Sequence, residues 1–371
     1  MLSTLVSSSM LNVAIDVETS SKPRHLPWID GSFLVCISMA WDNGDVRTWF
    51  FNHPDREKYH PDKTFRQTLE EVQYEINRAS RLIAHNAKFD LHWLSSVGLS
   101  VNSCLLYCTM LGEYLINSQS RQEGISLAEL CAKYNLPAKK DKVKIYWDAG
   151  AETDEVPIHI LKPYCEQDAI NSLAIFHEQV PRILGMGIQK LVSMEMEVMR
   201  CVGEMERNGM MLDKDLLQMY NNTYGEELSN IDNALSEELG IDNPNSGDQL
   251  SSALFGFQDR AGLFDPVANK IEALKKEGYY STAMPELLKL KAKTPEQKKI
   301  LDMLKHRSRL SQLKSTYFTG LQKHMRDGMI NHSINQCITV TGRTSCSSPN
   351  LQNIPRGNTG PVKQCFITRW R

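Results

Sequence analysis

Strand and helix signals in the first half of the chain come in an order that restricts the folds open to it. Short apolar runs bounded by turn residues predict strands, and apolar residues at helical spacing predict helices. Three strands are expected first, followed by a helix, a strand and two further helices: Leu11–Val17, Phe33–Trp41, Val46–Phe51, Thr64–Arg78, Leu82–His85, Ala87–Val97 and Ile158–Gln179. Strands followed by strand–helix alternation are typical of an α/β layer domain, which we expect at residues 1–185.

The second half of the chain has a different pattern. Helical periodicity prevails from Leu191 to Arg326, so residues 186–327 are expected to form a mainly helical domain. After Gly328, Val, Ile and Thr alternate as they do in strands, and residues 328–371 are expected to begin a further sheet. A length of 371 residues also favours two domains over one.

Charge is distributed unevenly along the chain, although the net charge is only −2. Residues 1–269 hold 23 basic and 38 acidic side chains, a net charge of −15. Residues 270–326 hold 14 basic and 5 acidic side chains, and residues 327–371 hold 5 and 1, so these two segments carry +9 and +4. A basic tract of this size is what the phosphates of a nucleic acid require, and a solvated helical face is the alternative explanation.

Composition excludes several classes of protein. There is no run of 18 apolar residues, so no membrane span is expected. The first ten residues are rich in Ser and lack a basic region, so no signal peptide is expected. The nine cysteines are scattered without a Cys-x-x-Cys pair, which favours reduced thiols over a zinc site. We therefore expect a cytoplasmic protein.

Acidic side chains occur in three of the expected elements. Asp16 and Glu18 are two residues apart on the first strand, so both lie on the same face. Asp90 follows the strand at Leu82–His85 and begins a helix. Tyr164 and Asp168 are four residues apart on the long helix, so they also share a face.

Four converging carboxylates favour one kind of chemistry. Ligands that offer only oxygen suit Mg²⁺ or Mn²⁺ better than zinc. Two such cations can activate a water molecule and stabilise the leaving oxygen when a phosphodiester is cleaved. The phenol of Tyr164 could orient that water. Each motif alone is also found as an ordinary strand end, a helix cap or a core tyrosine, and it is their order and context that favour the joint interpretation.

These motifs resemble those of the DEDDy 3′→5′ exonucleases, the class found in the proofreading domains of family A DNA polymerases. The resemblance implies an RNase H-like fold with a mixed sheet flanked by helices. It implies that Asp16, Glu18 and Asp168 hold one cation and that Asp90 serves the second. Tyr164 would hold the nucleophilic water, and Asn86 corresponds to an asparagine near the bound strand end.

The second half is similar to the polymerase module of the same family. The segment Glu206–Asp213 resembles the opening of that module, and residues 243–250 and 309–317 resemble its thumb. Thr341-Gly342-Arg343 followed by Pro349–Pro355 is the most specific match. The resemblance implies DNA contacts from five side chains: Arg309, Lys314, Arg343, Gln352 and Asn353. Arg343 could reach the minor groove, where all base pairs share acceptors.

The chain also departs from the family pattern. Thr344 stands where the family usually has Leu, and Gln312 stands at a usually basic position. No Asp or Glu follows Asp327, so the two aspartates of the polymerase palm are not in this sequence, nor is the fingers helix. We expect no primer extension by this chain alone. A polymerase split over two chains, an interrupted gene and a deliberately made fragment remain alternatives.

The function expected from the sequence is a metal-dependent 3′→5′ DNA exonuclease, the proofreading part of a family A polymerase in DNA replication. Its partners would be single-stranded 3′ ends and primer–template DNA, with two divalent cations as cofactors. The alternative is a DNA-binding or assembly subunit whose palm and fingers come from a second chain. An RNA exonuclease is less favoured because of the tract Thr341–Pro355.

Overall fold

The computed structural model describes residues 11–21, 26–120, 122–138, 142–355 and 360–369. The chain forms two compact units. The first unit extends to Asn208 and includes Ser333–Ser347, and the second contains Gly209–His332 and the residues from Ser348 onward. The segments 1–185, 186–327 and 328–371 stay a prediction, although the first of these boundaries falls inside a continuous helix that ends at Met186.

A five-stranded mixed sheet forms the centre of the first unit. The strands are β1 (Asn12–Thr19), β2 (Leu34–Trp41), β3 (Val46–Phe50), β4 (Arg81–Ala84) and β5 (Leu105–Cys108). Their order is β3-β2-β1-β4-β5. β1, β2 and β3 pair antiparallel, whereas β4 runs parallel to both β1 and β5. The α/β fold class expected from the sequence is therefore confirmed.

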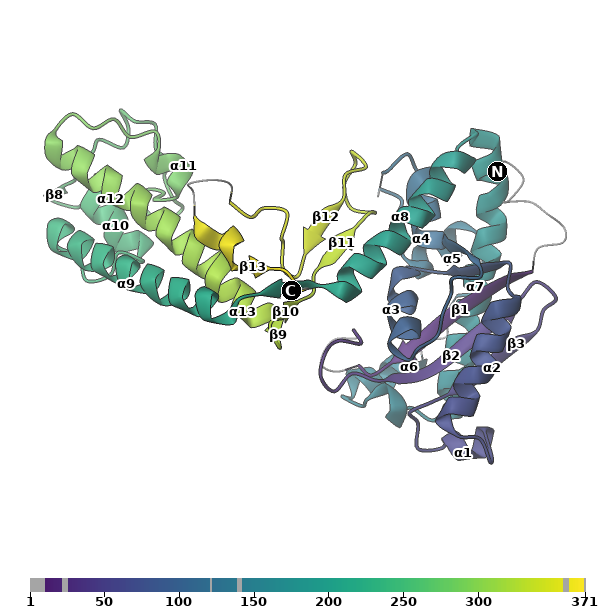
Figure 1. Cartoon of the computed structure of the whole chain (residues 1–371). Coiled ribbons are helices and arrows are strands. Elements are labelled where there is room, and N and C mark those ends of the chain that lie inside the picture. Colours follow the sequence, from purple (N-terminus) through teal and green to yellow (C-terminus); the bar gives the residue numbers. More distant parts are fainter. Residues whose placement is uncertain (1–10, 22–25, 121, 139–141, 356–359, 370–371) are drawn as a thin grey trace. The chain divides into compact units, whose positions relative to one another are not determined.

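Helices cover this sheet (Figure 1). They are α1 (Arg56–Tyr59), α2 (Phe65–Arg78), α3 (Lys88–Ser96), α4 (Thr109–Ile116), α5 (Leu127–Lys133), α6 (Lys142–Asp148), α7 (Ile158–Met186) and α8 (Gln189–Asn208), with the 3₁₀ turn η1 (Thr153–Glu155). The long helix α7 packs against β1, β2, β3 and β4. The polar and charged stretch before α7 reads as a loop in the sequence, but α6 and η1 lie within it.

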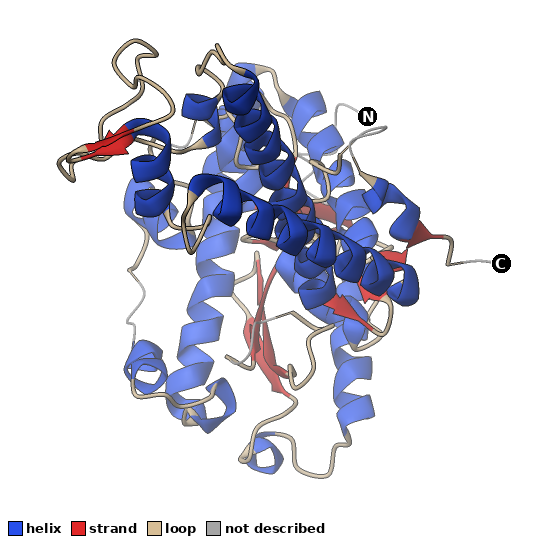
Figure 2. Cartoon of the chain, turned by 90° about the vertical axis from the view of Figure 1, so that its left-hand side faces the viewer, coloured by secondary structure: helices blue, strands red, loops and turns tan. Residues whose placement is uncertain are grey.

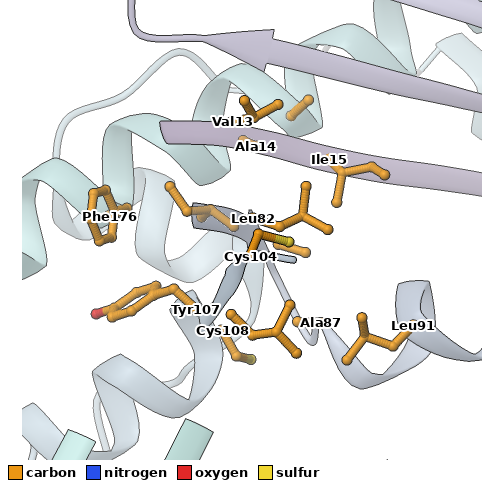
Figure 3. Packing of buried hydrophobic residues seen from close by; sticks show 14 of the residues in the cluster. Val13, Ala14, Ile15, Leu82, Ala87, Leu91, Cys104, Tyr107, Cys108 and Phe176 are labelled. Carbon is orange, nitrogen blue, oxygen red and sulfur yellow. The ribbon is translucent and has the colours of Figure 1, made fainter. Parts of the chain in front are cut away.

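The core of the first unit lies between the sheet and its helices. Figure 3 shows Val13, Ala14 and Ile15 of β1 packed near Leu82 of β4. Tyr107 of β5 and Phe176 of α7 meet edge to face with ring centroids 4.8 Å apart. Burying a Val, Leu, Ile or Phe side chain stabilises a fold by roughly 1.5–3 kcal/mol. This core therefore fixes the positions of β1 and α7.

Helices predominate in the second unit (Figure 2). They are α9 (Lys214–Leu239), α10 (Gly247–Phe255), α11 (Met284–Leu287), α12 (Pro295–Gln312), the π-helical segment η2 (Leu313–Thr319), α13 (Gly320–His324) and the 3₁₀ turn η4 (Pro361–Cys365). α9 packs along α12 and η2. The helical character expected here is confirmed.

Short strands accompany these helices. β13 (Phe366–Ile367), β6 (Met210–Leu212), β10 (Met329–Ile330) and β9 (Met325–Arg326) form a small sheet in that order, and β7 (Gly256–Phe257) pairs with β8 (Arg260–Ala261). In the first unit, β11 (Ser333–Asn335) and β12 (Ser345–Ser347) form an antiparallel hairpin. Strands were expected after Gly328, and the structure has them.

Candidate active site

Strand β1 supplies the first two acids of the candidate site. Asp16 and Glu18 are both half-buried, while Ile15 and Val17 between and beside them are buried in the core. This alternation is what the pleat of a strand imposes, and it brings both carboxylates to one face of the sheet. In the antiparallel register with β2, Asp16 lies opposite Ser38 and Glu18 opposite Cys36.

Asp90 comes from the first turn of α3 and is only 3% exposed. The N–H of Val17 donates to its Oδ1 at 3.2 Å, which ties the helix to β1. Burial raises the pKa of Asp90 well above its ordinary value, and the nearby carboxylates of Glu18 and Asp168 raise it further. The three acids are thus close enough to repel one another.

Helix α7 brings Asp168 and Tyr164 to the same region. Asp168 is buried, and Tyr164, one turn earlier, is half-buried. The ring of Trp147 from α6 meets the Tyr164 ring edge-on, with centroids 5.7 Å apart and planes at 90°. The indole nitrogen of Trp147 donates to Thr153 Oγ1 at 3.3 Å. α6 and η1 therefore restrict the position of the phenol that the sequence places in the site.

Cys165 is a residue of this site that the sequence analysis missed. Its Sγ donates to Asp16 Oδ2 at 3.3 Å, and one ligand atom each from Asp16, Glu18 and Cys165 lie within 4.8 Å of one another. The available signal was its spacing. Cys165 precedes Asp168 by three residues on a helix, so it had to share a face with that acid.

The donor set fits hard divalent cations. β1, α3 and α7 supply four carboxylates to the same region, and carboxylate oxygens are the preferred protein ligands of Mg²⁺ and Mn²⁺. The raised pKa of Asp90 shows that this cluster is costly to keep fully ionised without compensating positive charge. Cations among the acids would remove that cost.

Asn86 lies between β4 and α3, four residues before Asp90. Its φ of 57° is in the left-handed region, which Asn tolerates better than most residues. It lines a cavity of about 230 Å³ within the first unit, together with Lys88, Met110, Met199 and Gln336. The four acids are not among the residues that line this cavity. Asn86 thus lies four residues before Asp90 in the sequence and lines a cavity that the four acids do not line.

The expected DNA-contacting side chains fall in both units. Arg343 is exposed in the turn between β11 and β12, where Gly342 has a φ of 70°. Arg309, Gln352 and Asn353 are exposed in the second unit, and Lys314 is half-buried there. Tyr317 Oη donates to the carbonyl of Asn353 at 2.5 Å, which anchors the loop to η2. Arg343 therefore belongs to the first unit, as the four acids do, whereas the other four side chains belong to the second unit.

Family models match both halves of the chain. A model described as 3′-5′ exonuclease matches residues 3–183, and a model described as DNA polymerase family A matches residues 214–371. The chain belongs to DNA polymerase family A. It carries a 3′-5′ exonuclease domain followed by part of the polymerase domain, and the family expected from the sequence is confirmed.

Curated relatives agree with this assignment. The chain is 31% identical to DNA polymerase I of Chloroflexus aurantiacus over 78% of its own length and 30% of that protein. It is 31% identical to DNA polymerase I of a Synechocystis strain over 74% of its length and 27% of that protein. The chain therefore spans about a third or less of the length of these relatives.

A solved structure shares the fold. The POL domain of Pol1 from M. smegmatis, in complex with a DNA primer-template and dNTP, matches with a TM-score of 0.70 and 21% identity. The match covers 97% of this chain and 55% of that chain. Within the part of the chain that the structure describes, no helix is long and apolar enough to cross a membrane.

Proposed function

We propose that this chain is a metal-dependent 3′→5′ DNA exonuclease that removes mononucleotides from single-stranded or frayed 3′ ends. What supports the proposal is a domain that matches the exonuclease family model, in which Asp16 and Glu18 lie together on β1 and the carboxylates of Glu18 and Asp168 lie near enough to Asp90 to raise its pKa. Its place in a family A polymerase supports proofreading as the role. A cytoplasmic location stays a prediction.

We propose that the four acids share two cations. Asp16, Glu18 and Asp168 would hold one divalent cation, Mg²⁺ or Mn²⁺, and Asp90 would serve a second. Such cations, when bound, supply an activated water and stabilise charge on the scissile phosphate. The buried Asp90 carboxyl has a raised pKa, so a neighbouring cation would favour its ionised form.

Tyr164 and Asn86 would act on the water and the DNA. The Tyr164 phenol, whose ring Trp147 contacts edge-on, would hydrogen-bond the attacking water. Asn86, four residues before Asp90, would offer its amide to the last nucleotide of the strand. Neither contact reads a base, which suits an enzyme that must accept any sequence.

The test follows the length of a 5′-labelled single strand incubated with Mg²⁺. The native chain should shorten it from the 3′ end and release 5′-mononucleotides. Asp16→Ala combined with Asp168→Ala should lower the rate by several orders of magnitude, because the cations and their water are lost together. Glu57→Ala, an exposed acid on α1, is the matched control and should act like the native chain. Shortening that persists in the double variant would refute the proposal.

The polymerase segment supports binding of duplex DNA as a second role. Residues 270–326 carry a net charge of +9, and the M. smegmatis structure with the same fold is a complex with a primer-template. Helical Lys and Arg side chains can follow phosphates without reading sequence. A second chain that supplies palm and fingers stays an alternative. Fluorescence anisotropy of the full chain with a labelled primer-template tests the binding, and the absence of saturable binding would contradict it.

A further inference from the structure

A buried charged cluster surrounds Glu206 near the end of α8, in the first unit. Its side chain is 2% exposed. Oε1 accepts a hydrogen bond from Lys88 Nζ at 2.5 Å, and Oε2 lies 2.7 Å from His92 Nε2. Burial alone would raise the pKa of Glu206, but the hydrogen bonds from His92 and Lys88 outweigh it and lower that pKa. The carboxylate is therefore held ionised between two basic side chains.

The same cluster holds the backbone of β11. The N–H of Ile334 donates to Glu206 Oε1 at 2.5 Å, and Lys88 Nζ donates to the carbonyl of Ile334 at 2.5 Å. On its other side β11 pairs with β12, with Ile334 opposite Cys346. Lys88 and Glu206 thus bond the backbone C=O and N–H of Ile334, as a neighbouring strand would.

Both basic partners of Glu206 flank a metal-binding candidate. Lys88 and His92 lie two residues before and two residues after Asp90 on α3. Asp90 is tied to β1 by the hydrogen bond that the N–H of Val17 donates to its Oδ1, and its backbone belongs to α3. A small shift of α3 would therefore move the Asp90 carboxylate relative to those of β1.

We propose that Glu206 is a positioning residue for the exonuclease centre, joining the helix that carries Asp90 to the strand that leads into the Arg343 turn. The inference rests on the proposed exonuclease function. Outer groups that orient a ligand of a metal commonly change affinity or activity when they are removed, because a misplaced ligand binds its ion poorly. Glu206 would set the position of α3, and Asp90 would bind its cation less tightly without it.

Two variants separate positioning from stability. Glu206→Ala leaves Lys88 charged and buried without its carboxylate, which can destabilise the fold. The pair Lys88→Met with Glu206→Leu replaces the buried ion pair by apolar side chains of similar size, a change that is often neutral for folding. It still removes both links to Ile334. Glu204→Ala, an exposed acid two residues earlier on α8, is the matched control.

The readouts are Mn²⁺ binding and single-strand digestion by the full chain. Electron paramagnetic resonance titration gives Mn²⁺ affinity independently of activity, and far-ultraviolet circular dichroism with a melting curve confirms folding. In the double variant we expect the weaker Mn²⁺ site to lose affinity and the saturated digestion rate to fall, each by roughly 10-fold or more.

The outcomes distinguish this inference from the function on which it rests. If the native chain does not shorten DNA, the proposed function fails, whatever the variants do. If the native chain is active and the folded double variant matches Glu204→Ala in Mn²⁺ affinity and rate, the positioning role of Glu206 is overturned. Loss of both in the folded double variant, with Glu204→Ala unaffected, supports it.

Discussion

At the scale of single residues, the candidate site depends on the ionisation of a buried carboxyl group. Asp90 has a folded-state pKa well above its ordinary value of 3.8, chiefly because it is buried. In metal-free solution its protonated form therefore contributes stability that is fully present below about pH 3.8 and is lost as the pH rises through the folded-state pKa. Above that pKa the ionised Asp90 carboxylate lowers the stability of the metal-free fold, and bound cations would offset this loss.

Asp90→Asn should accordingly stabilise the metal-free protein at pH 7 while it abolishes digestion. The amide oxygen can still accept from Val17 N–H, and the buried charge is gone. The gain should be about 1.4 kcal/mol for each pKa unit by which Asp90 is raised. Chemical denaturation in chelator measures it, with Asp30→Asn, an exposed acid, as the control. A variant less stable than the native chain under these conditions would contradict the assignment.

The thiols offer a second residue-scale prediction. Burial raises the pKa of the Cys165 thiol well above its ordinary value, whereas Cys201 is exposed on α8. Because the thiolate is the reactive form, a disulfide reagent at pH 7 should modify Cys201 quickly and Cys165 only on unfolding. Mass spectrometry of the labelled peptides decides this. Rapid labelling of Cys165 in the folded chain would show that the site is more open than its burial indicates.

At the scale of elements, local sequence signals account for most of the first unit. Thr64 and Gln67 form a capping box at the start of α2, and each accepts from the other's backbone N–H. Thr64→Ala should lower the free energy of unfolding by about 0.5–2 kcal/mol, the usual cost of losing such a cap. Exonuclease activity should not change, because α2 supplies none of the four acids. A melting curve and a digestion assay on one preparation measure both.

Other elements could not be predicted, for physical reasons. β5 is four apolar residues long and leads directly into α4. An apolar run this short has no periodicity that distinguishes a strand from the first turn of a helix. α6 lies in a polar segment, and its position depends on Trp147 packing on Tyr164. Glu206 bonds to residues 114 to 128 positions away, and nothing in its own segment indicates those partners. The positions of the four acids on a strand, a helix start and a long helix were predictable, because each follows from its local sequence pattern.

At the scale of the whole molecule, charge separates the two halves. The front of the chain is acidic and residues 270–326 are basic, which suits phosphate binding by the second half. Arg343 belongs to the first unit by its contacts but is exposed in a turn. Duplex binding should therefore depend on salt.

Arg343→Ala tests this dependence. If Arg343 neutralises one phosphate, the slope of log affinity against log salt should become shallower by about 1. If it reads the minor groove without a phosphate contact, affinity should fall by a similar factor at every salt concentration. An unchanged affinity and slope would remove Arg343 from the DNA surface. Anisotropy titrations with a primer-template at several salt concentrations supply the data.

The central claim is that Asp16, Glu18, Asp90 and Asp168 share divalent cations. The most direct measurement is an anomalous difference map from crystals of the chain grown with Mn²⁺ and a short single strand. We predict two peaks among these carboxylates, with oxygen ligands at about 2.1 Å. A map with Mn²⁺ bound elsewhere and none at these four side chains would contradict the account.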